Sequence, residues 1–307
     1  MKDFRFSILR GKGEDTLKAH RHKVIVCVVM MVVLNISGRA QNMDSLLDQC
    51  FHSMYNLQFD KAFQIARQAK ALDQSDPMPW VAESAAVLFR ELDRLHILSS
   101  DLFVSDATFS ARPSYSWSGD SNRQFEEAVA AAEKLARDRI AKDKNDVRGL
   151  FALSMIYGLR ANDAALIGKR NLAGLSYTKT SSGFAERLLA LSPGYFDAYI
   201  ATGMSQYLIG SKPAPVRWVL RLGGFKGDQE QGLKELTLVA EHGRYLAPFA
   251  QVLLAFNDLR HQNPASAHKR FAVLHNQFPA NPLYLQEMAK CERPAALNGQ
   301  QSISGTQ

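Results

Sequence analysis

Apolar residues recur at intervals of three and four along most of the chain. Near the start of this pattern, Leu47, Cys50, Phe51 and Met54 fall on one face of a helix, because an α-helix turns once in 3.6 residues. Short stretches with Pro, Gly, Asn or Asp separate these runs, and such residues commonly end helices. No run alternates apolar and polar residues as a strand does. The pattern predicts an all-α domain over residues 41–292.

One interval sets the length of the repeating unit. Pro248 and Pro282 lie 34 residues apart, with Gln251, Leu254, Ala255, Ala267, Phe271 and Leu274 between them. This order of small and large apolar residues resembles a tetratricopeptide repeat (TPR), a helix–turn–helix unit of 34 residues. Comparable patterns precede it from residue 43 onward. We therefore predict a right-handed α-solenoid of about five TPR-like helical hairpins.

The other units depart from the 34-residue length through three insertions, residues 99–122, 160–179 and 210–228. The first contains Pro, Gly and several serines, and also four aromatic residues, Phe103, Phe109, Tyr115 and Trp117. So many aromatic residues favour an insertion that packs against the stack over one that contacts a ligand. The second is expected to be a long connection between two helices. The third contains a short amphipathic helix, and Asp228 with Gln231 then predicts a capping box for the next helix.

One glycine and two turns have predicted structural roles within the repeats. Gly203 stands where the repeat needs a small residue for close helix packing, although glycine is a poor helix former. The turn at Lys144-Asn145-Asp146 is equivalent to the earlier turn at Ser75-Asp76. We expect both turns to separate one hairpin from the next.

The polar residues 293–307 are expected to form a disordered tail.

The N-terminal residues predict export. Eleven apolar residues, Val24–Leu34, follow a basic segment, and Gly38 and Ala40 fit the small positions of a cleavage site. We interpret residues 1–40 as a signal peptide, with a location in the periplasm or cell envelope. The alternative is an uncleaved inner-membrane signal anchor over residues 24–36, which would bring the protein into contact with the membrane.

Charge and cysteine content exclude some functions. The chain of 307 residues has a formal net charge of +7, but residues 1–40 carry eight basic and three acidic residues and so account for +5 of it. The remainder is nearly neutral, and we expect no nucleic-acid binding. Cys50 and Cys291 lie at opposite ends of the predicted stack. In an extended stack they are too far apart for a disulfide, and we expect two buried thiols.

The chemistry-bearing motifs of common enzymes are absent from the sequence. There is no phosphate-binding glycine motif, zinc-protease motif or nucleophile elbow. His261, His268 and His275 are seven residues apart, but a turn at Asn263-Pro264 separates the first from the others. Metal sites usually need three or four converging ligands. We expect no cofactor, no metal and no enzymatic activity.

Candidate binding residues follow from the geometry of such stacks, in which the first helix of each hairpin lines the concave groove. The candidates for groove or partner binding are polar or aromatic first-helix residues: Tyr157, Asn162, Tyr199, Gln206, Gln251 and Asp258. The third insertion adds a basic patch around an aromatic residue: Arg217, Trp218, Arg221 and Lys226. This patch is either a site for an acidic partner or lipid headgroups, or a solvated face over a buried Trp218.

The segment Pro213–Leu233, with its Gly-Phe-Lys-Gly-Asp turn before a helix, resembles eukaryotic inclusion-body-clearance TPR proteins. Those proteins are intracellular and non-enzymatic, and the predicted signal peptide departs from them, so we do not carry over their cellular role. Leu222-Gly-Gly before a helix is also similar to the T-component of TRAP transporters, although the lipoprotein cysteine of that family is missing here. Neither family implies catalytic residues.

These observations predict a non-enzymatic TPR scaffold that binds a protein or peptide partner in the bacterial cell envelope. The alternative is a periplasmic solute-binding or transporter-associated component, in which the insertions close the groove into a ligand pocket. Geometry separates the two, because an open groove suits a peptide and a closed apolar cavity suits a solute.

Overall fold

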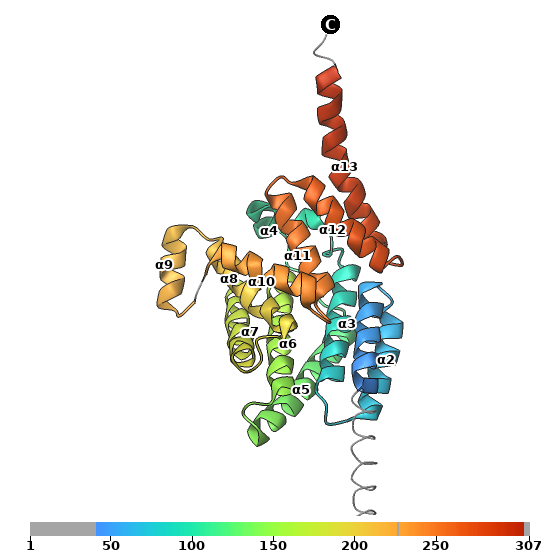
Figure 1. The fold of residues 1–307 in the computed structure, drawn as a ribbon, viewed down its shortest axis with the longest axis vertical. Helices are drawn as coiled ribbons and strands as arrows, with labels where there is room; N and C mark the ends of the chain where they lie inside the picture. Colours follow the sequence, from blue (N-terminus) through green and yellow to red (C-terminus); the bar gives the residue numbers. More distant parts are fainter. Residues whose placement is uncertain (1–40, 226, 304–307) are drawn as a thin grey trace, which may run out of the picture. The chain divides into compact units, whose positions relative to one another are not determined.

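The computed structural model describes residues 41–225 and 227–303, and all regular secondary structure among them is helical. The chain divides into two units, Met1–Ser45 and Leu46–Gln307. Of the first unit only residues 41–45 are described, and they are helical. The predicted signal peptide and signal anchor lie outside the described residues. The second unit contains the stack of helices (Figure 1).

Consecutive helices of the second unit pack as five hairpins, as the sequence predicts. Helical residues 46–55 contact α2 (Phe59–Leu72) through the Cys50 thiol, which donates to the carbonyl of Ala62. The other four pairs are α3 (Met78–Arg94) with α5 (Gly119–Lys142), α6 (Val147–Asn162) with α7 (Asn171–Leu191), α8 (Tyr199–Gly210) with α10 (Gln229–His242), and α11 (Ala247–Arg260) with α12 (Pro264–Gln277). The second helix of each hairpin also contacts the first helix of the next. The final helix, α13 (Pro282–Ile303), packs against α12.

The 34-residue interval is confirmed as one unit of this stack. Pro248 lies in the first turn of α11, Pro264 in that of α12, and Pro282 begins α13. A proline is tolerated there because the first N–H groups of a helix have no partner within it. Each proline therefore marks the start of a helix in the repeat.

Shorter elements occupy the insertions. The first holds η1 (Ser100–Leu102) and α4 (Asp106–Ala111), and the third holds α9 (Ala214–Leu222); η3 (Phe196–Ala198) precedes α8. The second insertion is not a long connection, and that prediction is wrong. It consists of the end of α6, one π-helical turn, η2 (Asp163–Ile167), and the start of α7, with only residues 168–170 outside a helix. The buried Ala164 and Ile167 extend the apolar face of α6 through this turn.

Helix α13 continues to Ile303 in the structure. The expectation of a disordered tail over residues 293–307 stays a prediction. Alanine and leucine at positions 295–297 favour a helix by propensity.

Small residues allow the helices to approach closely. Ala62, Ala66 and Ala69 on α2 are almost completely buried, and Ala128 and Ala132 repeat the spacing on α5. A four-residue interval places such residues on one face of a helix. The larger apolar residues beside them fill the layers between hairpins.

A close helix crossing joins α8 and α10 at two glycines. A Cβ atom added to Gly232 would lie 2.6 Å from the backbone nitrogen of Tyr207 and 2.7 Å from the carbonyl oxygen of Gly203. A Cβ atom on Gly203 would lie 3.1 Å from the carbonyl oxygen of Gly232. The prediction that Gly203 serves close helix packing is therefore confirmed, and Gly232 is its partner.

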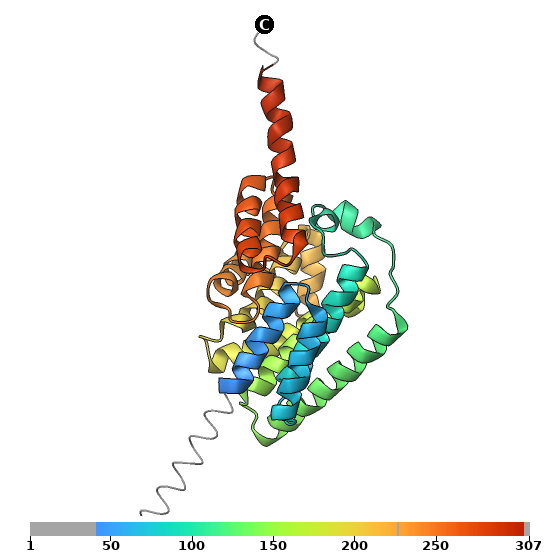
Figure 2. The same cartoon turned by 90° about the vertical axis from the view of Figure 1, so that its right-hand side faces the viewer.

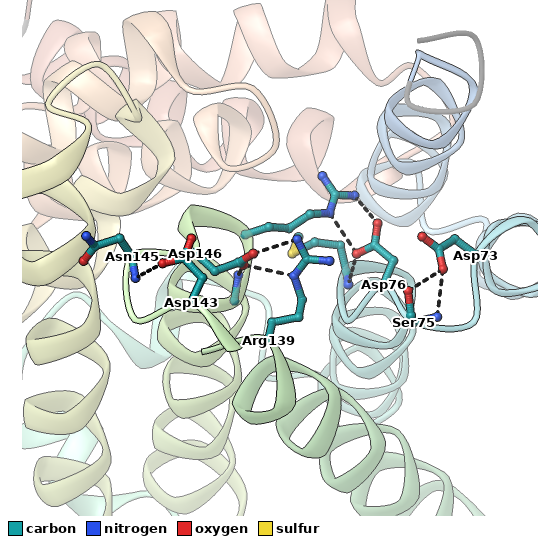
Figure 3. A network of polar contacts seen from close by, with 10 residues as sticks. Asp73, Ser75, Asp76, Arg139, Asp143, Asn145 and Asp146 are labelled. Atoms are coloured by element: carbon teal, nitrogen blue, oxygen red, sulfur yellow. Dashed lines mark hydrogen bonds and ion pairs between the residues drawn. The ribbon is translucent and has the colours of Figure 1, made fainter. Parts of the chain in front are cut away.

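Equivalent turns join the first hairpins, as expected (Figure 3). The Asp73 carboxylate accepts the backbone N–H and the hydroxyl of Ser75, and the Asp143 carboxylate accepts the N–H of Asn145. Three residues after each, a second aspartate accepts an N–H from the first turn of the next helix: Asp76 accepts that of Met78, and Asp146, the N-cap of α6, that of Gly149.

Arginines tie these capping aspartates to neighbouring helices. Arg139 binds Asp146 through two hydrogen bonds, 2.9 and 2.8 Å long. The Arg148 side chain from α6 reaches Asp76, 72 residues earlier, at 2.8 Å. The caps thus link three successive hairpins at one end of the stack.

Only one of the two hydrogen bonds of the predicted capping box forms at α10. The Asp228 carboxylate accepts the N–H of Gln231, so Asp228 is the N-cap. The Gln231 side chain, however, donates to Glu235 at 2.9 Å instead of returning to the backbone of Asp228. The competing acceptor is one helical turn further along α10.

The stack also makes contacts that an open solenoid lacks. Tyr55, at the end of the first helix, donates its hydroxyl to the carbonyl of Tyr245 at 3.0 Å. Asn281, just before α13, donates its amide to the carbonyl of Tyr55 at 2.9 Å, and Asn56 accepts the N–H of Ala280. The first hairpin therefore contacts the segments on both sides of the fifth hairpin, and the stack closes on itself.

A buried carboxylate shapes one of these contact points. Asp197 accepts the backbone N–H groups of Arg244, Tyr245 and Leu246 in the turn between α10 and α11. Burial raises the pKa of the Asp197 carboxyl above its ordinary value, although these hydrogen bonds oppose the shift. Asp197, just before α8, thus fixes the turn whose Tyr245 carbonyl accepts the Tyr55 hydroxyl.

Among the described residues, one helical stretch, Val147–Ile167, is long and apolar enough to cross a membrane by length and composition. In the structure 67% of its most apolar part is buried inside the protein. The stretch comprises α6 and η2, and its apolar residues form part of the core of the stack.

The glycine crossing yields a stability prediction. We expect Gly232→Ala to lower the free energy of unfolding by about 1–3 kcal/mol, the usual effect of overpacking a core. The added methyl group would meet backbone atoms of α8, which cannot move aside as a side chain can. Urea unfolding followed by circular dichroism measures the change.

Gly183→Ala is the matched control, because a Cβ atom at this α7 position has no neighbour within 4 Å. Here we expect an unchanged or increased stability, by up to about 1 kcal/mol, since alanine is the better helix former. Equal effects at both positions would contradict a close crossing at Gly232.

Candidate functional site

The closed stack contains an apolar cavity of about 290 Å³ that is partly open to solvent. Its wall comes from several regions of the chain, among them the end of the first helix, α3, the first insertion, α8 with α10, and α11 to α13. Representative side chains are Met54, Phe89, Leu98, Met204, Phe249 and Leu253. Ala165 and Leu166 of the π-helical turn also contribute. No single hairpin could form this space, which depends on the contact between the two ends of the stack.

Two tyrosines and an asparagine lie where the ends of the stack meet at the cavity. Tyr55, Tyr284 and Asn281 all line it and are buried. Burial raises the pKa of both tyrosine hydroxyls well above the ordinary value. Both therefore stay protonated across the physiological range and act as hydrogen-bonding groups without charge.

Charged groups occur on one side of the cavity. Arg260 of α11 donates to Asp106 of α4, and the ammonium nitrogen of Lys212 lies 4.0 Å from the same carboxylate. The hydrogen bond from Arg260, with the nearby charges of Lys212 and Arg260, lowers the pKa of Asp106 below its ordinary value. Tyr207 donates its hydroxyl to Asn257 at 3.0 Å, and both residues also line the cavity. Two cations and one carboxylate thus give this side a positive balance.

Glu287 places a second polar group in the wall. Its side chain is buried, at only 3% exposure, and one oxygen, Oε1, accepts from the ammonium group of Lys290 at 2.9 Å. The other oxygen, Oε2, is buried without a hydrogen-bond partner among the described residues. A buried acceptor without a partner is unfavourable.

The first insertion covers the cavity with two aromatic residues. Phe103 stacks on Phe256 of α11 at a ring-centroid distance of 5.0 Å, and Phe109 of α4 lies 6.0 Å from Phe103. Figure 2 shows this insertion crossing the outside of the stack between α3 and α5. The prediction that its aromatic residues pack against the stack is confirmed. Residues 99–118 form a cover, which we call the lid.

Buried glutamates attach the lid at both of its ends. Glu287 accepts the backbone N–H of Ser100 at 3.2 Å, and Glu91 accepts that of Ser118 at 2.6 Å. Arg94 also donates to Glu91 at 2.7 Å. Burial alone would raise the pKa of the Glu91 carboxyl, but the hydrogen bonds from Arg94 and Ser118 bring it below its ordinary value. Glu91 is therefore charged in the folded protein at neutral pH.

The second half of the lid follows the π-helical turn. Trp117 donates its indole N–H to Asp163 at 2.7 Å, and Tyr115 donates its backbone N–H to the carbonyl of Ile167 at 2.9 Å. The buried Arg112 donates to the carbonyls of Phe109 and Ala165. By contrast, α4 has no buried residue. The lid is tightly fixed along 112–118 and most exposed at α4.

Most of the predicted groove residues bond within the fold. Gln206 donates to Glu235 at 3.0 Å, and Gln251 and Asp258 both bind Arg270 on α12. Tyr157 donates to Glu133 and Tyr199 to the carbonyl of Pro193. Only Asn162 of the six lines the cavity. Their assignment to partner binding stays a prediction, but the structure does not bring the six residues together.

The predicted insertion patch lies on and around α9. Trp218 is exposed, so the alternative of a buried Trp218 is wrong. Arg221 is also exposed, and Arg217 donates to the carbonyl of Gly210 at 3.2 Å. Lys226 lies outside the described residues.

Sequence reasoning did not identify the residues of the cavity. The usable signal was the set of aromatic residues in a serine-rich insertion, which located Phe103 and Phe109 without locating their partners. Arg260 and the buried Glu91 and Glu287 lie on ordinary helices, and nothing in their local spacing marks them.

Reactive groups are scarce in the described part of the chain. No cluster of three His, Cys, Asp or Glu side chains there could hold a metal ion. Cys50 and Cys291 are buried free thiols, as predicted. Burial, with a contribution from Glu83, raises the pKa of Cys50 to about 12, so its thiol stays protonated and unreactive.

Comparisons with known proteins give little further information. No family model matches the chain, and no curated protein matches it. The crystal structure of a thermophilic TPR protein from Thermus thermophilus is similar at 14% identity and a TM-score of 0.39, over 76% of this chain and 90% of that one. At this TM-score the similarity carries no weight, and the fold assignment rests on the helices and contacts described above.

The attachment of the lid can be tested through Glu91. We expect Glu91→Gln to lower the free energy of unfolding by about 1.5–3 kcal/mol at neutral pH, the range for hydrogen bonds to a charged group. Because the folded-state pKa is lowered, the stabilisation is present above the unfolded pKa of about 4.3 and is lost as the pH falls through the folded value. Urea unfolding at pH 7 and pH 3 measures both effects.

Glu127→Gln on the exposed face of α5 is the matched control. It should change the free energy of unfolding little at either pH. If Glu91→Gln lowers the free energy of unfolding by the same amount at both pH values, Glu91 contributes through its shape and not through its charge.

Proposed function

We propose that this chain is a non-enzymatic binding protein whose cavity takes a small, mainly apolar molecule. The observation that carries the proposal is the apolar cavity of about 290 Å³ under the lid. This volume lies at the lower end of ligand pockets, which begin at about 300 Å³. An apolar cavity of this kind does not bind water well and instead favours an apolar guest.

The polar groups in the wall define the chemistry of the ligand more closely. Arg260 and Lys212 would attract an acidic or strongly accepting group at the α4 side. An apolar body with one polar end fits this distribution better than a uniformly polar solute such as a sugar.

This proposal develops the alternative in the sequence analysis, a solute-binding component whose insertions close the groove. It is supported by the contact between Tyr55 and Asn281 and by the internal bonds of the predicted groove residues. Both leave less open groove for an extended peptide than a linear stack offers.

A protein-binding scaffold is the second candidate. Stacks of helical hairpins generally present their surfaces to protein partners, and the exposed apolar residues Val273 and Leu285 on the last two helices provide one such surface. In this reading the cavity would serve only the packing of the stack. A small molecule that co-purifies in stoichiometric amount favours the first candidate. A protein partner that still binds to a variant whose cavity is filled by a larger side chain favours the second.

We also propose that the protein is exported to the periplasm or cell envelope. The apolar run Val24–Leu34 and the small residues Gly38 and Ala40 support it. N-terminal sequencing of the protein recovered from the envelope fraction should begin at Gln41. An intact N-terminus would instead favour an uncleaved anchor.

Cavity filling tests the proposed function directly. The probe is N-phenyl-1-naphthylamine, an apolar dye that becomes fluorescent in apolar surroundings. We expect the wild-type protein to bind it and Leu253→Trp to bind it at least about tenfold more weakly, because an indole occupies the space that the guest needs.

Val273→Trp places the same side chain on an exposed position of α12 and should leave dye binding unchanged. Leu98→Trp fills the cavity from another part of the wall and replaces Leu253→Trp in the dye-binding test if that variant does not fold. Dye binding that persists in both folded cavity variants would overturn the proposal.

A further inference from the structure

Helix α9 stands apart from the hairpins to which it is connected. Figure 1 shows it beside α8 and α10, joined to them by two loops. Few contacts hold it: Arg217 donates to the carbonyl of Gly210, and Lys179 from α7 donates to the carbonyl of Gly223 at 2.7 Å. The Lys179 ammonium also lies 5.0 Å from the centre of the Phe225 ring. These contacts fix the loops and leave the outer face of α9 uncovered.

That outer face is apolar. Trp218 is 64% exposed and Leu222 72%. Trp218 and Leu222 are four residues apart, so their side chains are neighbours on the helix surface. Two large apolar side chains this exposed on one short helix are unusual for a surface that only meets water.

The charged residues of α9 itself are both basic. Residues 198–227 contain no Asp or Glu, and Arg217 and Arg221 lie on α9. Lys179 adds a third cation through its contact with the loop after the helix. Lys212, which precedes α9, lies 4.0 Å from Asp106 and belongs to the cavity wall instead. On the helix surface Arg221 lies beside the apolar face and not within it, because it is three residues from Trp218 and one from Leu222.

We propose that α9 docks the protein on a membrane surface that contains anionic lipids. An indole and a leucine on one side of a short helix can enter the boundary between headgroups and acyl chains. Arginines and lysines at the edge of the same face reach the phosphate and carboxylate groups of the lipids. The absence of acidic residues from positions 198–227 suits a negatively charged surface. The site is independent of the cavity and of its proposed ligand.

An acidic protein partner is the main alternative. The lipid surface is favoured because the apolar side chains project from a single short helix, without a groove or second helix to recognise a partner of fixed shape. Insertion into a lipid boundary needs no complementary shape and uses the tryptophan in its usual interfacial place.

The test uses the protein that begins at Gln41, the proposed mature form, so that the apolar run Val24–Leu34 does not itself bind the vesicles. Binding is measured by co-sedimentation with vesicles of phosphatidylcholine alone and of phosphatidylcholine with about one third phosphatidylglycerol. We expect binding to the anionic vesicles to weaken roughly tenfold in the double variant Trp218→Ser, Leu222→Ser. Arg221→Ala should weaken binding to anionic vesicles and leave binding to neutral vesicles unchanged.

The double variant Val273→Ser, Leu285→Ser removes a similar exposed apolar area from α12 and α13 and should bind as the wild type does. Circular dichroism verifies that all variants are folded. Equal binding of the α9 variant and the wild type would overturn the proposal. So would a photoreactive benzoylphenylalanine at position 222 that crosslinks to an acidic protein in envelope extract and not to lipid.

Discussion

The contact between the first helix and the segments around the fifth hairpin is the constraint on which the rest depends. Tyr55 bonds to Tyr245 and Asn281, residues that lie on either side of α11 and α12. Without these bonds the hairpins would form an open stack, and Met54 and Tyr55 would not share a cavity wall with α11 to α13. Closure brings residues from both ends of the stack into the wall of one apolar cavity.

The hairpins and the insertions have different roles in this structure. The hairpins supply a rigid frame through small residues, capped turns and the glycine crossing of α8 and α10. The lid covers the cavity, the π-helical turn adds part of its wall, and α9 presents an apolar and basic face outside it. Two buried glutamates hold the lid to the frame. In our proposals the binding functions are thus carried by the departures from the repeat, on a frame that the repeat builds.

Particular residues show how far the sequence could go. Gly203, the equivalent turns at Asp76 and Asp146, and the packing of Phe103 were predictable, because each follows from a repeat position, a turn motif or an aromatic residue in a polar segment. Residues 160–179 were misjudged because composition alone does not reveal that α6 continues through a π-helical turn almost to the start of α7. Gln251 and Asp258 were predicted to line the groove and bind a partner, yet Arg270 on the next helix binds both.

The sequence by itself determined the helices, their capping residues and the hairpin repeat, since these depend on a local period and on hydrogen bonds between near neighbours. Whether the stack stays open or closes was decided only in the tertiary structure. Small rotations between successive hairpins add up along the chain, and no single segment encodes their sum. The meeting of Tyr55 with Asn281, the cavity and the burial of Glu287 all follow from that sum.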